Sequence, residues 1–177
     1  AEADPSLGQI LFQGEQFFCD HQGGLFWPEK QCLIVSDLHL EKGAAMAAGG
    51  TLMPPYDTGE TLNRLGQCIA RWRPEKVICL GDSFHRDDSA SRLPLQYRVQ
   101  LTALMGAKDW LWITGNHDPE RPEGLQGDCL PELALGPLNF RHEQMAHAGE
   151  DLFTRQTGEI SGHLHPSAVI HRRNKRL

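Results

Sequence analysis

The stretch Leu33-Ile34-Val35-Ser36-Asp37-Leu38-His39 joins a continuous aliphatic run to two side chains that can bind a metal ion. An uninterrupted apolar run of this kind is typical of a strand buried on both faces of a parallel or mixed sheet. In an extended or turning segment, residues two apart point to the same side, so Asp37 and His39 can reach one ion together. The stretch therefore predicts a buried strand with a pair of ligands at its carboxyl end.

Two later stretches repeat this pattern of an apolar run followed by polar residues. Val77-Ile78-Cys79-Leu80 leads into Gly81-Asp82, and Trp110-Leu111-Trp112-Ile113 leads into Gly115-Asn116-His117-Asp118. Both runs have the length and the β-branched or aromatic content of buried strands. We expect all three strands to end in side chains that suit a metal ion.

Two helices are predicted between these strands. The first begins at Asp57, which has the capping-box partner Glu60 three residues later, and it ends before Pro74. The second covers residues 94–105 and ends at Gly106. The order strand, helix, strand, helix, strand is typical of an α/β fold, in which ligands bind at the carboxyl ends of the strands.

Shorter strands are predicted on either side of this unit. A hairpin is expected over residues 9–18, and Leu25-Phe26-Trp27 predicts a further short strand. Two late strands are expected near residues 138–141 and 158–161. Residues 119–136 contain several prolines and glycines and are predicted to form a loop.

Length, charge and cysteine content narrow the class of protein. With 177 residues, the chain is expected to form one domain, residues 1–177. Its net charge of −6 argues against a protein that coats nucleic acid electrostatically, although it allows a local grip on a few phosphates. No apolar run approaches the ~20 residues needed to cross a bilayer, so no membrane partner is expected. The five cysteines lack paired spacing and predict reduced thiols in a cytoplasmic protein.

Two further motifs lie near the end of the sequence. Gly162-His163-Leu164-His165 is again a pair of ligands two residues apart, and His142 stands alone after a predicted strand. Each motif has an ordinary structural explanation by itself, because a Gly-Asp at a strand end is usually a turn and a lone histidine is usually a surface or core residue. Their order behind successive strands, with glycines where the backbone must turn sharply, indicates a metal site. His147 is the alternative to His142, which is preferred because it directly follows an apolar strand.

Taken in order, these motifs resemble the signature of the calcineurin-like metallophosphoesterases: D-x-H, G-D, G-N-H-D, a lone H and G-H-x-H. The resemblance covers residues 30–166 and implies a layered α/β/β/α sandwich with its metal site at the carboxyl ends of the strands. It also implies two divalent metal ions. One ion would be held by Asp37, His39, Asp82 and His165. The second ion would be held by Asp82, Asn116, His142 and His163.

The chemistry of this ligand set follows from the resemblance. Mixed nitrogen and oxygen ligands suit manganese, iron or zinc better than calcium or magnesium. Asp82 would bridge, because a carboxylate has two oxygens to share between ions about 3.5–4 Å apart, and such a pair activates water for in-line attack on phosphorus. His117 is not needed as a ligand. The resemblance makes it the general acid that protonates the leaving oxygen, with Asp118 orienting it.

Three other residues are candidates for contacting the phosphate: His85, Lys42 and Arg141. His85 lies three residues after Asp82, and a merely supporting role is equally open for it. For Lys42 and Arg141, a solvated surface role is the alternative.

Longer sequence segments resemble a more specific family, the bacterial DNA-ligase-associated metallophosphoesterases. The phrases are Asp37-Leu38-His39-Leu40-Glu41-Lys42-Gly43, Leu52-Met53-Pro54-Pro55-Tyr56-Asp57-Thr58, Gly81-Asp82-Ser83-Phe84-His85 and Gly158-Glu159-Ile160-Ser161-Gly162-His163-Leu164-His165-Pro166. This resemblance implies a Mn-dependent phosphodiesterase and DNA endonuclease in DNA repair, with a functional link to DNA ligase and helicase. Single-stranded DNA is the expected substrate. The family has further strands after its last motif, so we expect this chain to lack them. The alternative is a small-molecule phosphomonoesterase or nucleotide phosphodiesterase of the same superfamily.

Overall fold

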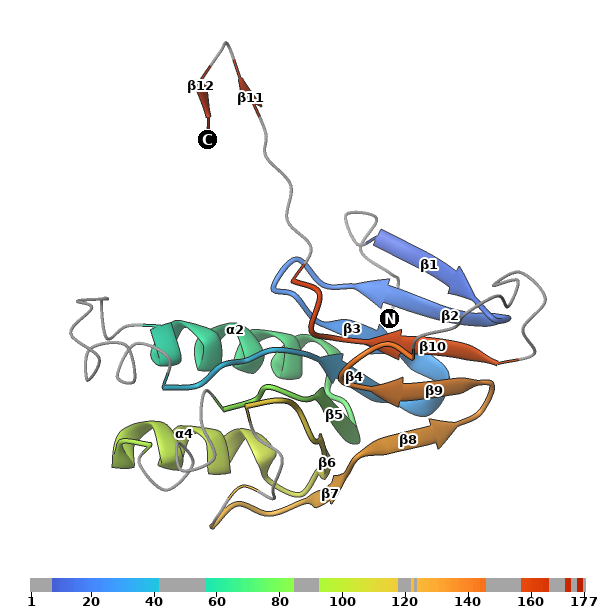
Figure 1. Cartoon of the computed structure of the whole chain (residues 1–177). Coiled ribbons are helices and arrows are strands. Elements are labelled where there is room, and N and C mark those ends of the chain that lie inside the picture. The colour runs from blue at the N-terminus through green and yellow to red at the C-terminus, as the bar shows by residue number, and fades with distance from the viewer. Residues whose placement is uncertain are drawn as a thin grey trace.

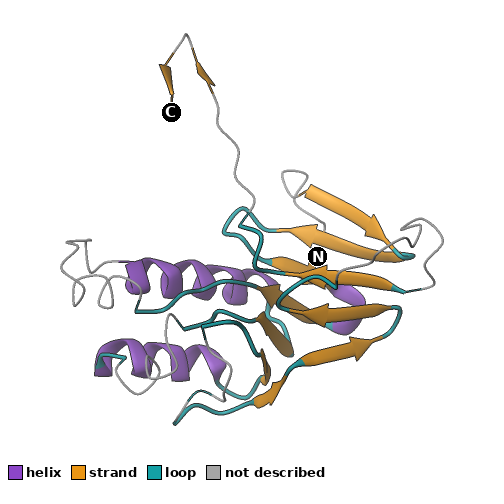
Figure 2. Cartoon of the chain, in the orientation of Figure 1, coloured by secondary structure: helices purple, strands orange, loops and turns teal. Residues whose placement is uncertain are grey.

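The computed structural model describes residues 8–41, 57–84, 93–117, 122, 124–145, 157–165, 171–172 and 175–176. These residues form two helices and two main sheets, which lie in layers (Figure 1). Figure 2 shows the helices together on one side of the strands. No described helix is both long and apolar enough to span a membrane.

The larger sheet has seven strands in sequence order. They are β1 (Gly8–Phe12), β2 (Glu15–Cys19), β3 (Leu25–Trp27), β4 (Cys32–Val35), β5 (Lys76–Leu80), β6 (Asp109–Ile113) and β7 (Asp128–Leu130). The strands from β1 to β4 pair antiparallel, and those from β4 to β7 pair parallel. Parallel pairing places the carboxyl ends of β4, β5 and β6 at the same edge of the sheet.

Successive side chains of the central strands point to opposite faces of the larger sheet, and a separate hydrophobic core lies on each face. In β5, Val77 and Cys79 belong to one core, and Ile78 and Leu80 belong to the other. The first core is covered by α2 (Asp57–Trp72) and α4 (Leu95–Met105). A short 3-10 turn, η1 (Pro28–Lys30), joins β3 to β4. All the central strands are buried on both faces, as their uninterrupted apolar sequences predict.

The second core is covered by a three-stranded sheet in the order β10-β9-β8. Its strands are β8 (Glu132–Leu135), β9 (Leu138–Arg141) and β10 (Gly158–Ser161). Because β9 and β10 pair parallel, the residues that follow them emerge side by side. A separate two-stranded pair is formed by β11 (His171–Arg172) and β12 (Lys175–Arg176).

The mixed α/β class predicted from the sequence is confirmed. The hairpin, the buried strands, both helices and the two late strands all lie where they were expected. The loop predicted over residues 119–136 was wrong, because that segment contains β7 and β8. These two strands have only three and four residues, and Pro131 separates them, so neither has a periodicity that can be recognised locally. Of the four layers expected, the described residues form three, with both helices on the larger sheet.

Candidate metal centre

The loops that follow β4 and β5 run side by side beyond the ends of their strands. The backbone N–H of Asp37 donates to the carbonyl of Gly81 at 3.2 Å, and that of His39 donates to the carbonyl of Asp82 at 2.9 Å. A parallel bridge between Leu40 and Phe84 continues the same pairing. The two loops are therefore held to each other, which brings their predicted ligand residues to one edge of the sheet.

Left-handed backbone conformations recur at the predicted ligands. Positive φ angles are found at Asp37 (52°), His39 (44°), Asp82 (48°), His163 (66°) and His165 (42°). A non-glycine residue in this region costs of order 1–3 kcal/mol and persists where the surrounding structure dictates it, often at functional sites. Glycine would relieve the strain but would supply no ligand. At these five positions the backbone therefore presents a side chain at the cost of this strain.

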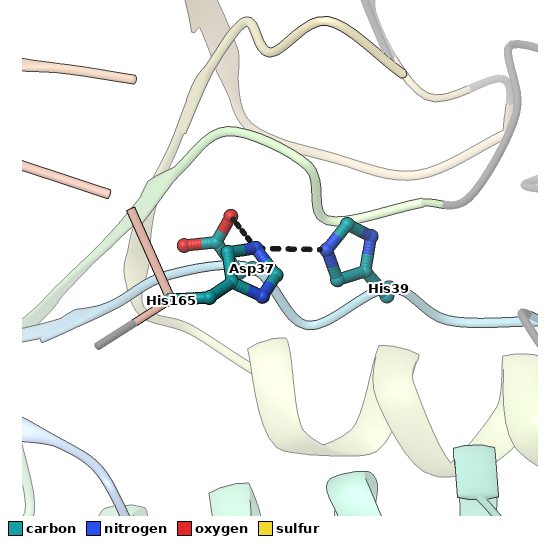
Figure 3. Close-up of side chains that lie close together, drawn as sticks. All are labelled: Asp37, His39 and His165. Atoms are coloured by element: carbon teal, nitrogen blue, oxygen red, sulfur yellow. Dashed lines mark hydrogen bonds and ion pairs between the residues drawn. The ribbon is translucent and has the colours of Figure 1, made fainter. Parts of the chain in front are cut away.

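Asp37, His39 and His165 form the first group of possible ligands (Figure 3). His165 Nε2 lies 3.0 Å from Asp37 Oδ1 and 3.3 Å from His39 Nε2. One candidate ligand atom from each residue lies within 4.8 Å of the others. Figure 3 shows the two residues of the loop after β4 meeting a histidine from the far end of the chain.

Asp82, His142 and His163 form the second group. Asp82 and His142 are both buried, and His142 Nε2 lies 3.3 Å from Asp82 Oδ2. The rings of His142 and His163 meet edge to face, with their centroids 5.0 Å apart. The two groups are adjacent, because the backbone N–H of His163 donates to Asp37 Oδ2 at 3.1 Å.

His142 shows that this second group fits a metal ion. Its Nδ1 lies 2.8 Å from the carbonyl oxygen of Leu80, which can only accept, so Nδ1 carries a proton. In neutral imidazole the other nitrogen, Nε2, is then a bare acceptor. This Nε2 is buried, has no hydrogen-bond partner among the described residues, and faces the Asp82 carboxylate. Two electron-rich atoms buried together are stabilised by a cation, and metal-bound histidines commonly donate their second N–H to a backbone carbonyl in this way.

Residues 30–167 match the family model described as calcineurin-like phosphoesterase. The chain belongs to this family. It is a metal-dependent phosphoesterase, as the sequence motifs predicted. Among solved structures, the nuclease MPE of Pseudomonas putida is similar, with a TM-score of 0.71 and 26% sequence identity. The likeness covers 97% of this chain and 80% of that chain. No curated protein sequence gave a match.

Two glycines allow backbone segments of the calcineurin-like phosphoesterase centre to approach each other closely. A Cβ atom on Gly81 would lie 2.6 Å from His142 Cγ, and its φ of +78° also favours glycine. A Cβ atom on Gly162 would lie 2.8 Å from Asp37 Oδ2 and would also strike the Ser36 side chain. Each glycine therefore stands where one ligand-bearing segment passes close to another.

The other predicted site residues are placed as follows. His117 is half-exposed, its backbone N–H donates to Asp82 Oδ1 at 3.0 Å, and its Nε2 lies 4.0 Å from Asp82 Oδ2. Asn116 is exposed and directly precedes it. Arg141 forms ion pairs with Glu132 at 2.9 Å and Glu159 at 3.4 Å, so its charge is already balanced. Asp118, His85, Lys42 and the alternative His147 lie outside the described residues.

Two residues near the ligands were not anticipated from the sequence. The Ser36 hydroxyl donates to Asp37 Oδ2, which orients that carboxylate. Glu143 Oε1 lies 3.9 Å from His163 Nε2. Both directly neighbour a predicted ligand in the sequence, which is the only signal that could have indicated them.

Gly162→Ala should weaken metal binding by this phosphoesterase. The added methyl would push Asp37 or Ser36 away, and disturbing the residues that orient ligands typically costs 10–100-fold in affinity. We expect a loss of about that size in Mn²⁺ titrations followed by calorimetry or electron paramagnetic resonance.

Gly8→Ala is the matched control, because its Cβ atom would meet Cys19 at an ordinary 3.6 Å. Equal Mn²⁺ affinity in the wild type and Gly162→Ala would contradict the close approach described here.

Proposed function

We propose that this calcineurin-like phosphoesterase is a dinuclear phosphodiesterase, and specifically a Mn-dependent DNA endonuclease that acts in DNA repair. The observation that carries the proposal is the meeting of two ligand groups beside the buried carboxylate of Asp82. The similarity to a solved nuclease at 26% identity supports a nucleic-acid substrate. The sequence phrases shared with the DNA-ligase-associated family support DNA, and with it a functional link to ligase and helicase in the cytoplasm.

In this proposal the described ligands divide between two ions. One ion would be held by Asp37, His39, Asp82 and His165, and the other by Asp82, Asn116, His142 and His163. Divalent ions bound there supply Lewis acidity that neutralises the phosphate and activates water at neutral pH. The oxygen donors of Asp37, Asp82 and Asn116 favour manganese over the softer ions that thiolates select. The buried position of Asp82 keeps its carboxylate fixed toward His142, His117 and the edge of the sheet.

In this proposal His117 is the residue that moves a proton. Its side chain is half-exposed at the rim of the centre, next to Asp82 and with its ring 5.6 Å from that of His39. The accessible imidazole can protonate the leaving oxygen, which is the step that a poor leaving group requires. Asp118, the next residue, would orient His117 and stabilise its protonated form.

Single-stranded or frayed DNA is the substrate that the proposal favours. A chain with net charge −6 is not expected to offer an extended basic groove to a duplex, whereas a flexible strand can bend one phosphate into the centre. The decisive test is cleavage of circular single-stranded and duplex DNA with Mn²⁺ over a salt series. Because few phosphates are contacted, we expect a shallow salt slope, at about −0.7 per phosphate on single strands. A protein that cuts neither DNA but hydrolyses a nucleotide or a phosphomonoester would replace this proposal with the small-molecule alternative.

Asp82→Ala should abolish activity and reduce the number of bound ions below two per chain. The substitution removes a proposed ligand and also the negative charge that would hold the cations. The loss of turnover should therefore exceed the 10–100-fold loss that is typical when a residue that only orients a ligand is mutated. Elemental analysis after Mn²⁺ loading checks the stoichiometry. Asp128→Ala, an exposed aspartate at the start of β7, is the control and should behave as wild type. Near-normal activity in Asp82→Ala would refute the ligand assignment.

His117→Ala should retain both ions and lose turnover on DNA by about 10²–10⁴-fold, the usual contribution of a general acid. The defect should be smaller on bis-p-nitrophenyl phosphate, since p-nitrophenolate leaves without full protonation. Parallel kcat measurements on the two substrates, with metal analysis, separate this role from a structural one. An equal defect on both, accompanied by metal loss, would mean that His117 supports the centre instead.

A further inference from the structure

A cavity of about 210 Å³ lies beside the first ligand group. Its walls come from the β2–β3 turn, from the loop after β4 and from one face of α2. We propose that this cavity binds the nucleotide adjacent to the scissile phosphodiester, and that Arg64 at its wall contacts the phosphate flanking that nucleotide. The inference rests on the proposed action on DNA and adds a subsite to it.

The cavity adjoins the candidate metal centre at Asp37. Asp37 lines the cavity and also belongs to the first ligand group, in contact with His165. A polynucleotide whose phosphate lies at this group therefore has its next sugar and base beside the cavity. A volume below the about 300–1,000 Å³ of typical ligand pockets suits one nucleotide rather than a whole cofactor.

The walls of the cavity are held in place before any ligand binds. Asp20, buried in the β2–β3 turn, accepts a hydrogen bond from Trp72 Nε1 at 2.8 Å and lies 3.6 Å from Arg71 Nε, so it ties the turn to the end of α2. The side-chain amide Nε2 of Gln22 also donates to Gln67 Oε1 at 2.8 Å, which links the turn to α2. A preformed wall reduces the ordering cost of binding.

The wall chemistry suits a nucleotide. Leu65 and Cys68 supply an apolar surface, and burial, together with the nearby Asp20 carboxylate, raises the pKa of the Cys68 thiol to about 11. That thiol is therefore uncharged at neutral pH. Gln22 and Thr61 add an amide and a hydroxyl that can bond to base or sugar edges.

Arg64 supplies the positive charge. Its Nε lies 2.9 Å from Glu60 Oε1 in an exposed pair one helical turn apart, and both side chains are more than half exposed. Exposed pairs of this kind contribute little to stability, so the guanidinium can exchange its partner at small cost. A phosphate accepts two parallel hydrogen bonds from a guanidinium, a geometry that lysine cannot reproduce.

The test compares single-stranded oligonucleotide with bis-p-nitrophenyl phosphate, which has no flanking nucleotide. Arg64→Ala should lower the ratio of kcat/KM for oligonucleotide to that for the small diester by about tenfold, mainly through KM. The salt slope should become shallower by about 0.7. Glu60→Gln removes the competing carboxylate and should leave the oligonucleotide KM unchanged or lower. Lys108→Ala, which removes a cation just before β6 at the opposite edge of the sheet, should leave both substrates unaffected.

An unchanged ratio in Arg64→Ala, while the wild type cleaves DNA, would overturn the subsite and leave the proposed function intact. Hydrolysis of the small diester without any DNA cleavage by the wild type would instead refute the proposed function. Binding of a fluorescent single-stranded oligonucleotide, measured by anisotropy, then decides the subsite without turnover. Equal dissociation constants for wild type and Arg64→Ala would overturn it.

Discussion

The structure around the candidate centre depends on one constraint, the burial of the Asp82 carboxylate at the end of β5. An ionised carboxylate out of water is costly unless positive charge and hydrogen bonds surround it. Asp82 accepts the backbone N–H of His117, and its carboxylate lies 3.3 Å from the buried Nε2 of His142. In neutral imidazole this Nε2 is an acceptor, because Nδ1 carries the proton that is bonded to Leu80. A bound cation would balance these electron-rich atoms, so the proposed metal site and the burial of Asp82 depend on each other.

The same constraint accounts for the strained backbone at the ligands. Side chains from three strand ends and from the G-H-x-H segment must converge, and the chain achieves this by left-handed turns at residues such as Asp37 and His163. Such turns are unfavourable locally and need rigid surroundings. The strands supply that rigidity, because β4, β5 and β6 are packed on both faces by the two cores. Favourable packing in the sheets therefore compensates for the cost of the strained backbone at their edge.

Much of this could be read from the sequence because ligand chemistry restricts residue types so strongly. Asp37 and His39 stand behind an apolar run, and His163 and His165 form a second pair of histidine or carboxylate side chains two residues apart. The packing of the three-stranded sheet on the larger sheet brings the two motifs together. The sequence could not reveal β7 and β8, whose three or four residues are strands only because β6 and β9 pair with them. Nor could it reveal the cavity wall, since residues 22 and 64 become neighbours only when the β2–β3 turn docks on α2.

The charge distribution reconciles an acidic chain with an anionic substrate. The excess of carboxylates makes general attraction of DNA weak, so affinity has to arise where positive charge is concentrated. Ions held by the two ligand groups would supply that charge at the reacting phosphate, and Arg64 would extend it by one nucleotide along the cavity wall. Under the proposed function, such an enzyme would discriminate against intact duplex without a dedicated recognition surface. In the proposed binding mode, a stiff duplex could not deliver one phosphate to the centre and the neighbouring nucleotide to the cavity, whereas a single strand could do both.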